Sequence, residues 1–220
     1  MNLFIKQLQI YNIGLGASRY AWNAHMSLFI LGLRNDLFCL NLQYSAICIK
    51  KILNVMQRIA KKKKIILFVI PPFVYLKSML KQDLNYTKQL LWNLKNISLL
   101  SIVNWFFGLL TNFKVVNKNY KTLPVNRLPD VLFVLVNKIT EVTDFINISR
   151  EGFAMNLLTF GLSDSSQNPY TYHYTIPSNS KSFETITFFY RFFCCYFFIL
   201  NLKLYSNFFS SLIKFKLKKR

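Results

Sequence analysis

Short apolar runs alternate with longer amphipathic stretches along this chain. Residues 65–70, 97–102, 131–136 and 157–162 are mainly apolar, and the first run stops at Pro71-Pro72. Runs of this length between turn signals are typical of strands buried on both faces of a parallel sheet. We therefore predict four such strands, with a short edge strand at 174–176 before Pro177.

The stretches between these runs are predicted to be helical from the spacing of their apolar residues, over 43–60, 73–81, 108–120, 140–151 and 183–200. Four lysines at 61–64 follow the first helix, where cations are favoured by the helix dipole. Gly152 is expected to end the fourth helix in a left-handed conformation. Strands alternating with helices indicate βαβ units, so we predict an α/β domain.

Composition adds a strong positive charge to this fold. The 28 Lys and Arg residues outnumber the 8 Asp and Glu residues, which gives a formal net charge of +20. Self-repulsion of this size is offset by a polyanion, either a nucleic acid or an anionic membrane surface. The eight carboxylates form no pair at a spacing that suggests general acid/base catalysis, so we do not expect an enzyme.

Neither a metal site nor a nucleotide cofactor is expected. The two histidines are far apart in sequence, and no Cys-x-x-Cys pair exists among Cys39, Cys48, Cys194 and Cys195. Gly14-Leu15-Gly16 begins like a dinucleotide-binding loop, but Arg19 stands where the third glycine is needed. A small-molecule substrate is likewise not expected.

The main alternative is a membrane-spanning protein. Residues 97–113 form an uncharged run of 17 residues, at the lower limit for crossing a bilayer, but five of them are polar. The last predicted helix contains Glu184 and Arg191, and a charge at the helix centre costs about 2.5–3.5 kcal/mol on insertion scales. We expect a chain that does not span a membrane. An organellar integral membrane protein is the alternative, and an enzyme on a Rossmann-like sheet comes third.

Composition also bears on the compartment. Phe, Lys, Asn and Ile are abundant, as in proteins encoded by AT-rich genomes, which indicates an organelle or a reduced bacterium. The first twenty residues contain neither a long apolar core with a cleavage site nor an Arg-rich pattern. We therefore expect neither a secretory signal nor a transit peptide.

Nucleic acid is the polyanion that fits the basic residues best, because Lys and Arg neutralise phosphates. One candidate group is Arg19 with Trp22 and Asn23, in a predicted loop. A second is the lysine run Lys61, Lys62, Lys63 and Lys64. A third is the tail, with Lys214, Lys216, Lys218, Lys219 and Arg220.

Six segments, in order from about Ile13 to Phe193, resemble the ribosomal protein S2 family. The most specific is 105–113 (WFFGLLTNF), which is similar to the central signature of that family. The others are 14–26, 32–42, the Pro-Asp pair before the third strand, the turn at 164–169, and 174–179 (YTIPSN). The signature positions are Gly14, Gly16, Trp105, Gly108, Thr111, Phe113, Pro129, Asp130, Asp164, Pro169, Pro177 and Asn179.

The resemblance implies a flavodoxin-like (Rossmann-like) parallel sheet flanked by helices. It implies a structural role near the junction of head and body in the small ribosomal subunit. The expected partners are small-subunit ribosomal RNA and neighbouring ribosomal proteins, with Asn112 as a further RNA-binding candidate and no cofactor. Base-specific reading is expected to be minor. Codon bias, degenerate motifs and the missing transit peptide favour a mitochondrion-encoded copy in the mitochondrial matrix, with a plastid as the alternative.

The largest departures from the family are in two regions. Only residues 114–128 separate the Thr-Asn-Phe block from Pro129, so the long helical hairpin of the family is expected to be largely missing. The Phe-rich, basic C-terminal extension beyond Phe193 has no clear counterpart. We accordingly expect a single α/β domain over residues 1–193, followed by a Phe-rich helix and basic tail over 194–220.

Overall fold

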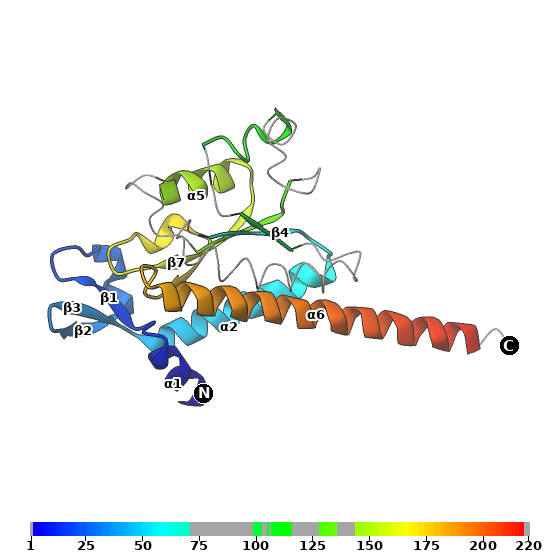
Figure 1. Ribbon diagram of the computed structural model, residues 1–220, viewed down its shortest axis with the longest axis horizontal. Helices are drawn as coiled ribbons and strands as arrows, with labels where there is room; N and C mark the ends of the chain where they lie inside the picture. The colour runs from blue at the N-terminus through cyan, green and yellow to red at the C-terminus, as the bar shows by residue number, and fades with distance from the viewer. Residues whose placement is uncertain are drawn as a thin grey trace.

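A computed structural model describes residues 2–70, 99–102, 105, 107–115, 128–135 and 144–217 (Figure 1). The predicted helix at 73–81 lies outside the described residues, as do Lys218, Lys219 and Arg220. The remaining predicted elements fall wholly or partly within them.

In the described part of the chain, five parallel strands form the main sheet: β4 (Ile66–Val69), β5 (Leu99–Ile102), β6 (Val131–Val134), β7 (Leu158–Ser163) and β8 (Tyr174–Pro177). Their spatial order is β5-β4-β6-β7-β8. Counted within the sheet, this order is 2-1-3-4-5, which is the flavodoxin-like arrangement. The predicted fold class is therefore confirmed, and so are the four predicted strands and the edge strand, with burial shown for β4, β6 and β7.

Helices cover both faces of this sheet. α1 (Asn2–Ile10), α2 (Leu42–Lys61) and α6 (Phe183–Leu217) lie on one face, and α5 (Asp144–Ala154) lies on the other (Figure 1). Successive side chains of a strand point to opposite faces. In β4, Phe68 accordingly packs with α2 and α6, whereas Leu67 and Val69 belong to the opposite core.

The core beneath α6 is rich in Phe. Phe133 of β6 stacks on Phe68 at 5.1 Å between ring centroids, and Phe193 of α6 lies 4.6 Å from Phe133. Phe189 and Phe197 are also fully buried. Burial of each such ring contributes about 1.5–3 kcal/mol, so α6 is a principal source of stability.

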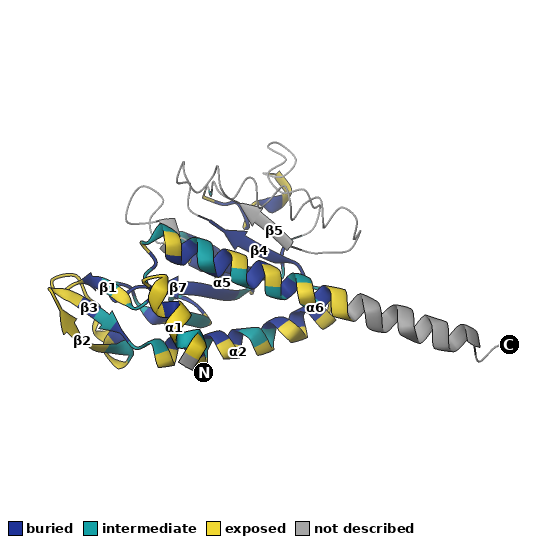
Figure 2. Cartoon of the chain, turned by 60° about the horizontal axis from the view of Figure 1, so that its bottom comes forward, coloured by how far each residue is buried: buried dark blue, intermediate teal, exposed yellow. Residues whose placement is uncertain are grey.

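α6 extends further than predicted and continues beyond the body of the domain (Figure 1). By length and composition its Phe183–Lys203 stretch could cross a membrane, but 44% of that apolar window is buried inside the protein. The apolar core helix of a folded domain also has this length and composition, so the length and composition of α6 favour membrane insertion only weakly. Figure 2 shows that α2 and α6 each have buried and exposed residues. The other candidate run, 97–113, contains strand β5 and residues buried in the core.

A second, antiparallel sheet precedes the main one. It consists of β1 (Leu15–Ser18), β2 (Ile30–Arg34) and β3 (Leu37–Leu40), in the order β1-β3-β2. Asn35 and Asp36 join β2 to β3, and both have positive φ, at 49° and 57°. Two such residues in a two-residue connection are characteristic of a type I′ hairpin turn.

Two local predictions were wrong. α5 continues through Gly152 to Ala154, and the left-handed residue after it is Asn156, with φ of 52°. A Cβ on Gly152 would lie 2.9 Å from Thr159 Cγ2, so this glycine allows close packing of helix on sheet. The helix predicted from Gly108 also starts later: residues 107–112 form turns, and helical structure begins at Phe113.

Candidate nucleic-acid interface

Two loops meet where β7 ends, and Ser165 joins them. The backbone N–H of Ala17 donates to Ser165 Oγ at 2.7 Å, and the N–H of Asn23 donates to the Ser165 carbonyl at 2.8 Å. Gly16 makes this approach possible, because a Cβ there would lie 2.7 Å from Ser165 Oγ. The segment after β1 is thereby fixed to the main sheet, although Ala17 and Ser165 are 148 residues apart.

Each loop contains a short 3-10 helix capped by an asparagine. Asn23 Oδ1 accepts from the N–H of His25 at 3.0 Å and begins η1 (Ala24–Phe29). Asn168 Oδ1 accepts in the same way from the N–H of Tyr170 and begins η2 (Pro169–Thr171). Since the side-chain oxygen of Asn23 is used in the cap, its contribution in this structure is to shape the loop.

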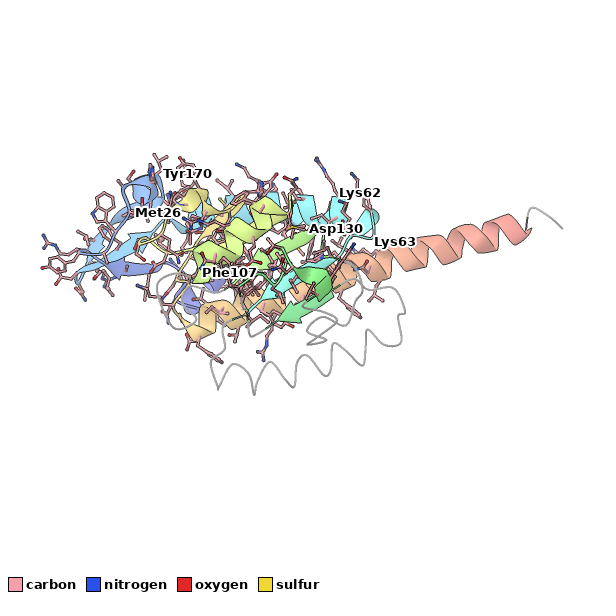
Figure 3. The ribbon with its side chains drawn as sticks, turned by 90° about the horizontal axis from the view of Figure 1, so that it is seen from above. Met26, Lys62, Lys63, Phe107, Asp130 and Tyr170 are labelled. Atoms are coloured by element: carbon pink, nitrogen blue, oxygen red, sulfur yellow. The ribbon has the colours of Figure 1, made fainter. Side chains whose placement is uncertain are left out.

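Exposed rings and one cation project from these loops, and we call this group the aromatic-basic surface: Arg19, Tyr20, Trp22, His25 and Tyr170. The Arg19 guanidinium lies 5.5 Å from the Tyr20 ring, and His25 meets Tyr170 edge-to-face at 5.5 Å. Trp22 remains about half exposed while its ring packs against Phe38 at 5.7 Å. Figure 3 shows Tyr170 beside Met26, so η1 and η2 are neighbours.

Arg19 also lies 3.9 Å from Asp36, but both side chains are more than half exposed. Exposed pairs of this kind contribute about 0–1 kcal/mol and are screened by salt. Arg19 is therefore available to a phosphate at little cost.

The lysine run lies at the other end of the domain. Lys61, Lys62 and Lys63 are exposed at the end of α2, and we call them the lysine cluster. Lys64 is different, because its Nζ lies 3.5 Å from Asp130 Oδ1. Figure 3 shows Lys62 and Lys63 well away from Tyr170. The structure therefore does not bring the lysine cluster together with the aromatic-basic surface.

The basic tail is a third, separate region. Lys214 and Lys216 belong to the last turns of α6, which project from the body (Figure 1). Three basic regions are thus distributed around the chain, at the β1–β2 loop, at the end of α2 and at the end of α6.

The central signature is held by a residue that the sequence reasoning missed. Glu151 of α5 is buried, and its Oε1 and Oε2 accept from the N–H groups of Gly108 and Leu110 at 2.8 and 3.0 Å. Gly108 has φ of +83°, which favours glycine. The sequence contained a usable signal. Glu151 lies three residues after Ile148, so the two side chains share one face of α5, which is buried, and a buried carboxylate requires a partner.

Within the signature, the expected roles divide by exposure. Leu109, Leu110 and Phe113 are buried, and Trp105 packs against them. The side chains of Thr111 and Asn112 are exposed, and the Asn112 N–H donates to the Gly108 carbonyl at 2.8 Å. Asn112 is accordingly accessible, whereas Phe113 belongs to the core.

The other signature residues tie elements together. Asp130, after buried Pro129, accepts from the Ile65 N–H at 2.9 Å and aligns β6 with β4. The Asn179 N–H donates to the Ile13 carbonyl at 3.0 Å, and the Pro177 carbonyl accepts from Ser45 Oγ at 2.6 Å. At the signature glycine Gly14, an added Cβ would lie 3.4 Å from the Leu42 side chain, which is ordinary van der Waals contact.

Asp164 is almost fully buried at the end of β7. Its Oδ1 accepts from the Ser165 N–H at 2.7 Å, and its Oδ2 lies 3.4 Å from Lys181 Nζ. Burial raises the pKa of Asp164 above its usual value, while the Lys181 ammonium and the bonds from Ser165 oppose the shift. This carboxylate anchors the Ser165 junction to the segment that precedes α6.

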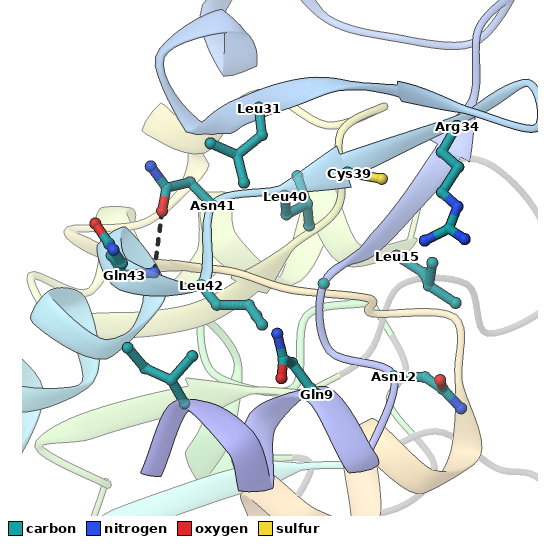
Figure 4. A pocket seen from close by; sticks show the side chains of 12 residues that line it. Gln9, Asn12, Leu15, Leu31, Arg34, Cys39, Leu40, Asn41, Leu42 and Gln43 are labelled. Atoms are coloured by element: carbon teal, nitrogen blue, oxygen red, sulfur yellow. Dashed lines mark hydrogen bonds between the residues drawn. The ribbon is translucent and has the colours of Figure 1, made fainter. Parts of the chain in front are cut away.

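A pocket of about 500 Å³ lies between α1, the antiparallel sheet and the start of α2 (Figure 4). Leucines form much of its lining, with polar ends supplied by Gln9, Asn12, Arg34, Asn41 and Gln43. No carboxylate or histidine is among these lining residues. In the described part of the chain, no three His, Cys, Asp or Glu side chains gather where they could hold a metal ion.

Comparison with known proteins agrees with the sequence resemblance. The sequence model of the family described as ribosomal protein S2 matches residues 11–127, more than half of the chain. The small ribosomal subunit protein uS2m of Acanthamoeba castellanii is 24% identical, over 86% of this chain and 56% of its own length. The small ribosomal subunit protein uS2 of Marinobacter nauticus is also 24% identical, over 77% of this chain and 76% of its own length. The chain therefore spans little more than half the length of the Acanthamoeba relative.

Proposed function

Because this chain belongs to the ribosomal protein S2 family, we propose that it is a structural constituent of a small ribosomal subunit. It binds small-subunit ribosomal RNA and neighbouring ribosomal proteins and has no catalytic role. The candidate residues for RNA contact are those named from the sequence, with Arg19 and Trp22 foremost in the β1–β2 loop.

The observation that carries this proposal is the placement of the positive charge. Basic residues lie in three regions on different sides of the domain: Arg19 in the β1–β2 loop, the lysine cluster at the end of α2, and Lys214 and Lys216 at the end of α6. A single acidic ligand would be met by one concentrated patch, whereas a folded RNA surrounds a protein and presents phosphates in several directions. Phosphate contacts of this kind position a protein on RNA without reading its sequence.

Location within the cell and the ribosome is part of the same proposal. The similarity to the Acanthamoeba uS2m protein and the AT-biased composition support a mitochondrial ribosome in the matrix, with a plastid ribosome as the alternative. Family membership supports a position near the junction of head and body.

Sedimentation tests the proposal directly. Lysate containing the tagged full chain is separated on sucrose gradients before and after ribonuclease treatment. We expect the chain to migrate with small-subunit ribosomal RNA and to leave that position when the RNA is degraded. Migration that is indifferent to ribonuclease would overturn the proposal. Carbonate extraction tests the membrane alternative, for which α6 is long enough, and retention in the carbonate-washed membrane pellet would favour it.

A further inference from the structure

The aromatic-basic surface exposes more ring area than a folded domain needs to leave in water. Tyr20 is 87% exposed and Tyr170 is 70% exposed, and His25 is exposed beside Tyr170. Large aromatic side chains are usually mostly buried, and exposed groups of them mark recognition surfaces.

The backbone that carries two of these rings, His25 and Tyr170, is fixed before any ligand arrives. The Asn23 and Asn168 caps fix the helical turns that carry His25 and Tyr170. Both turns are joined to the segment around Ser165, since the Asn23 N–H donates to the Ser165 carbonyl. Anchored rings lose little conformational freedom on binding, which makes them effective contact points.

Charge distinguishes this surface from the lysine cluster. The aromatic-basic surface carries one permanent cation, Arg19, and exposed Asp36 lies 3.9 Å from it. The lysine cluster presents three consecutive exposed cations. Phosphate neutralisation alone therefore suits the lysine cluster, and the aromatic-basic surface is better suited to ligands with flat, apolar faces.

We propose that the aromatic-basic surface binds unpaired nucleotides of RNA by stacking bases on Tyr20, Trp22 and Tyr170, with Arg19 on an adjacent phosphate. Specific RNA contacts concentrate on single-stranded loops and ends, whose bases can stack on aromatic side chains. The lysine cluster contacts the backbone of paired RNA. This inference rests on the proposed function and assigns its ligand as unpaired rather than double-stranded RNA.

The test compares two RNA probes on the full-length purified chain. A labelled single-stranded oligouridylate and a labelled RNA duplex are titrated by fluorescence anisotropy at several salt concentrations. Stacking contributes enough per base that we expect Tyr170→Ala and Tyr20→Ala each to weaken single-strand binding by about 5- to 100-fold. Duplex binding should change less than about two-fold, and the salt dependence of single-strand binding should keep its slope, because no cation is removed.

Matched variants separate stacking from its alternatives. Tyr170→Phe keeps the ring and should retain single-strand affinity, whereas a hydroxyl contact would be lost. Leu28→Ala removes a non-aromatic side chain of η1 that is 73% exposed and should have no effect. Arg19→Gln should reduce the salt slope by about one, and Lys62→Gln should weaken duplex binding.

The outcomes distinguish the two proposals. Tyr170→Ala and Tyr20→Ala proteins that are folded by circular dichroism and bind oligouridylate like the parent chain would refute stacking. Equal weakening for both probes would also refute it. In either case Lys62→Gln would still report on the proposed function. If neither probe binds the parent chain at physiological salt, RNA binding itself fails. If an alanine variant does not fold, the proposal is decided by Tyr170→Phe, which should retain single-strand affinity, and by Arg19→Gln, which should reduce the salt slope.

Discussion

Glu151 is predicted to hold the signature turn at 107–113 against the sheet, and Glu151→Gln tests this. Both carboxylate oxygens accept from buried backbone N–H groups, at 2.8 Å for Gly108 and 3.0 Å for Leu110. The amide of Gln keeps one acceptor oxygen and turns an N–H₂ group toward the other donor. One buried N–H is then left without a partner.

The magnitude follows from the number of donors that lose their acceptor. An unpaired buried donor costs about 1–3 kcal/mol. We therefore expect Glu151→Gln to lower the free energy of unfolding by about 1–3 kcal/mol and Glu151→Ala by about 2–6 kcal/mol. The free energy of unfolding of a typical domain is only about 5–15 kcal/mol. The Ala variant could therefore unfold the domain, so the Gln variant is the more informative of the two.

Urea unfolding measures the global effect, and amide hydrogen exchange measures the local one. Protection should fall at Gly108 and Leu110 even if the rest of the domain stays closed. The matched control is Glu184→Gln, where an exposed glutamate accepts one bond from Asn12 Nδ2 at 3.3 Å, and its cost should stay below about 1 kcal/mol. Unchanged exchange at Gly108 and Leu110 in Glu151→Gln, with stability equal to the control, would refute the reasoning.

Two further predictions concern packing and pH. Gly161→Ala should lower the free energy of unfolding by about 1–3 kcal/mol, because the new Cβ would clash with the Tyr172 ring. The control is Gly32→Ala, where the added Cβ would have no other atom within 4 Å. Equal urea midpoints for the two variants would contradict the packing argument. Burial raises the pKa of Asp164 in the folded state. The protonated carboxyl therefore contributes fully to the free energy of unfolding below the pKa of the unfolded chain, and this contribution is lost as pH rises through the folded-state pKa. Asp164→Asn should therefore gain stability relative to the parent chain as pH rises from about 4 to 7, and a parallel pair of stability–pH curves would count against the burial argument.

The main sheet could be predicted from sequence because its signal is local. Residues 66–69 and 131–134 are wholly apolar, and strands buried on both faces need no partner information to be recognised. The antiparallel sheet has no comparable pattern, since every residue of β2 after Ile30 is exposed. The position of the antiparallel sheet is set by contacts with Ser165, 148 residues beyond Ala17. A contact between residues so far apart produces no periodic pattern in the sequence.

The same distinction explains the errors and omissions at the candidate site. Gly152 was assigned a conformational role from its position near a helix end, but its actual constraint is the Thr159 side chain on the neighbouring strand. His25 and Tyr170 are 145 residues apart in sequence, so their contact was not predictable without the fold. A weaker clue existed, since Tyr20 and Tyr170 are aromatic residues in predicted loops next to Arg19 and Pro169.

The resemblance to the ribosomal family rests mainly on residues that build the scaffold. Gly16, Gly108 and Asp130 act through close approach, backbone conformation or ties to backbone N–H groups. Tyr170, an exposed residue that a ligand would meet, lies outside the six segments that carry the resemblance. This separation has a physical basis, because a buried tie fits only one geometry, whereas an exposed ring can be replaced without strain. A family signature therefore predicts where the loops will be held, and the chemistry they present has to be established from the exposed residues of this chain.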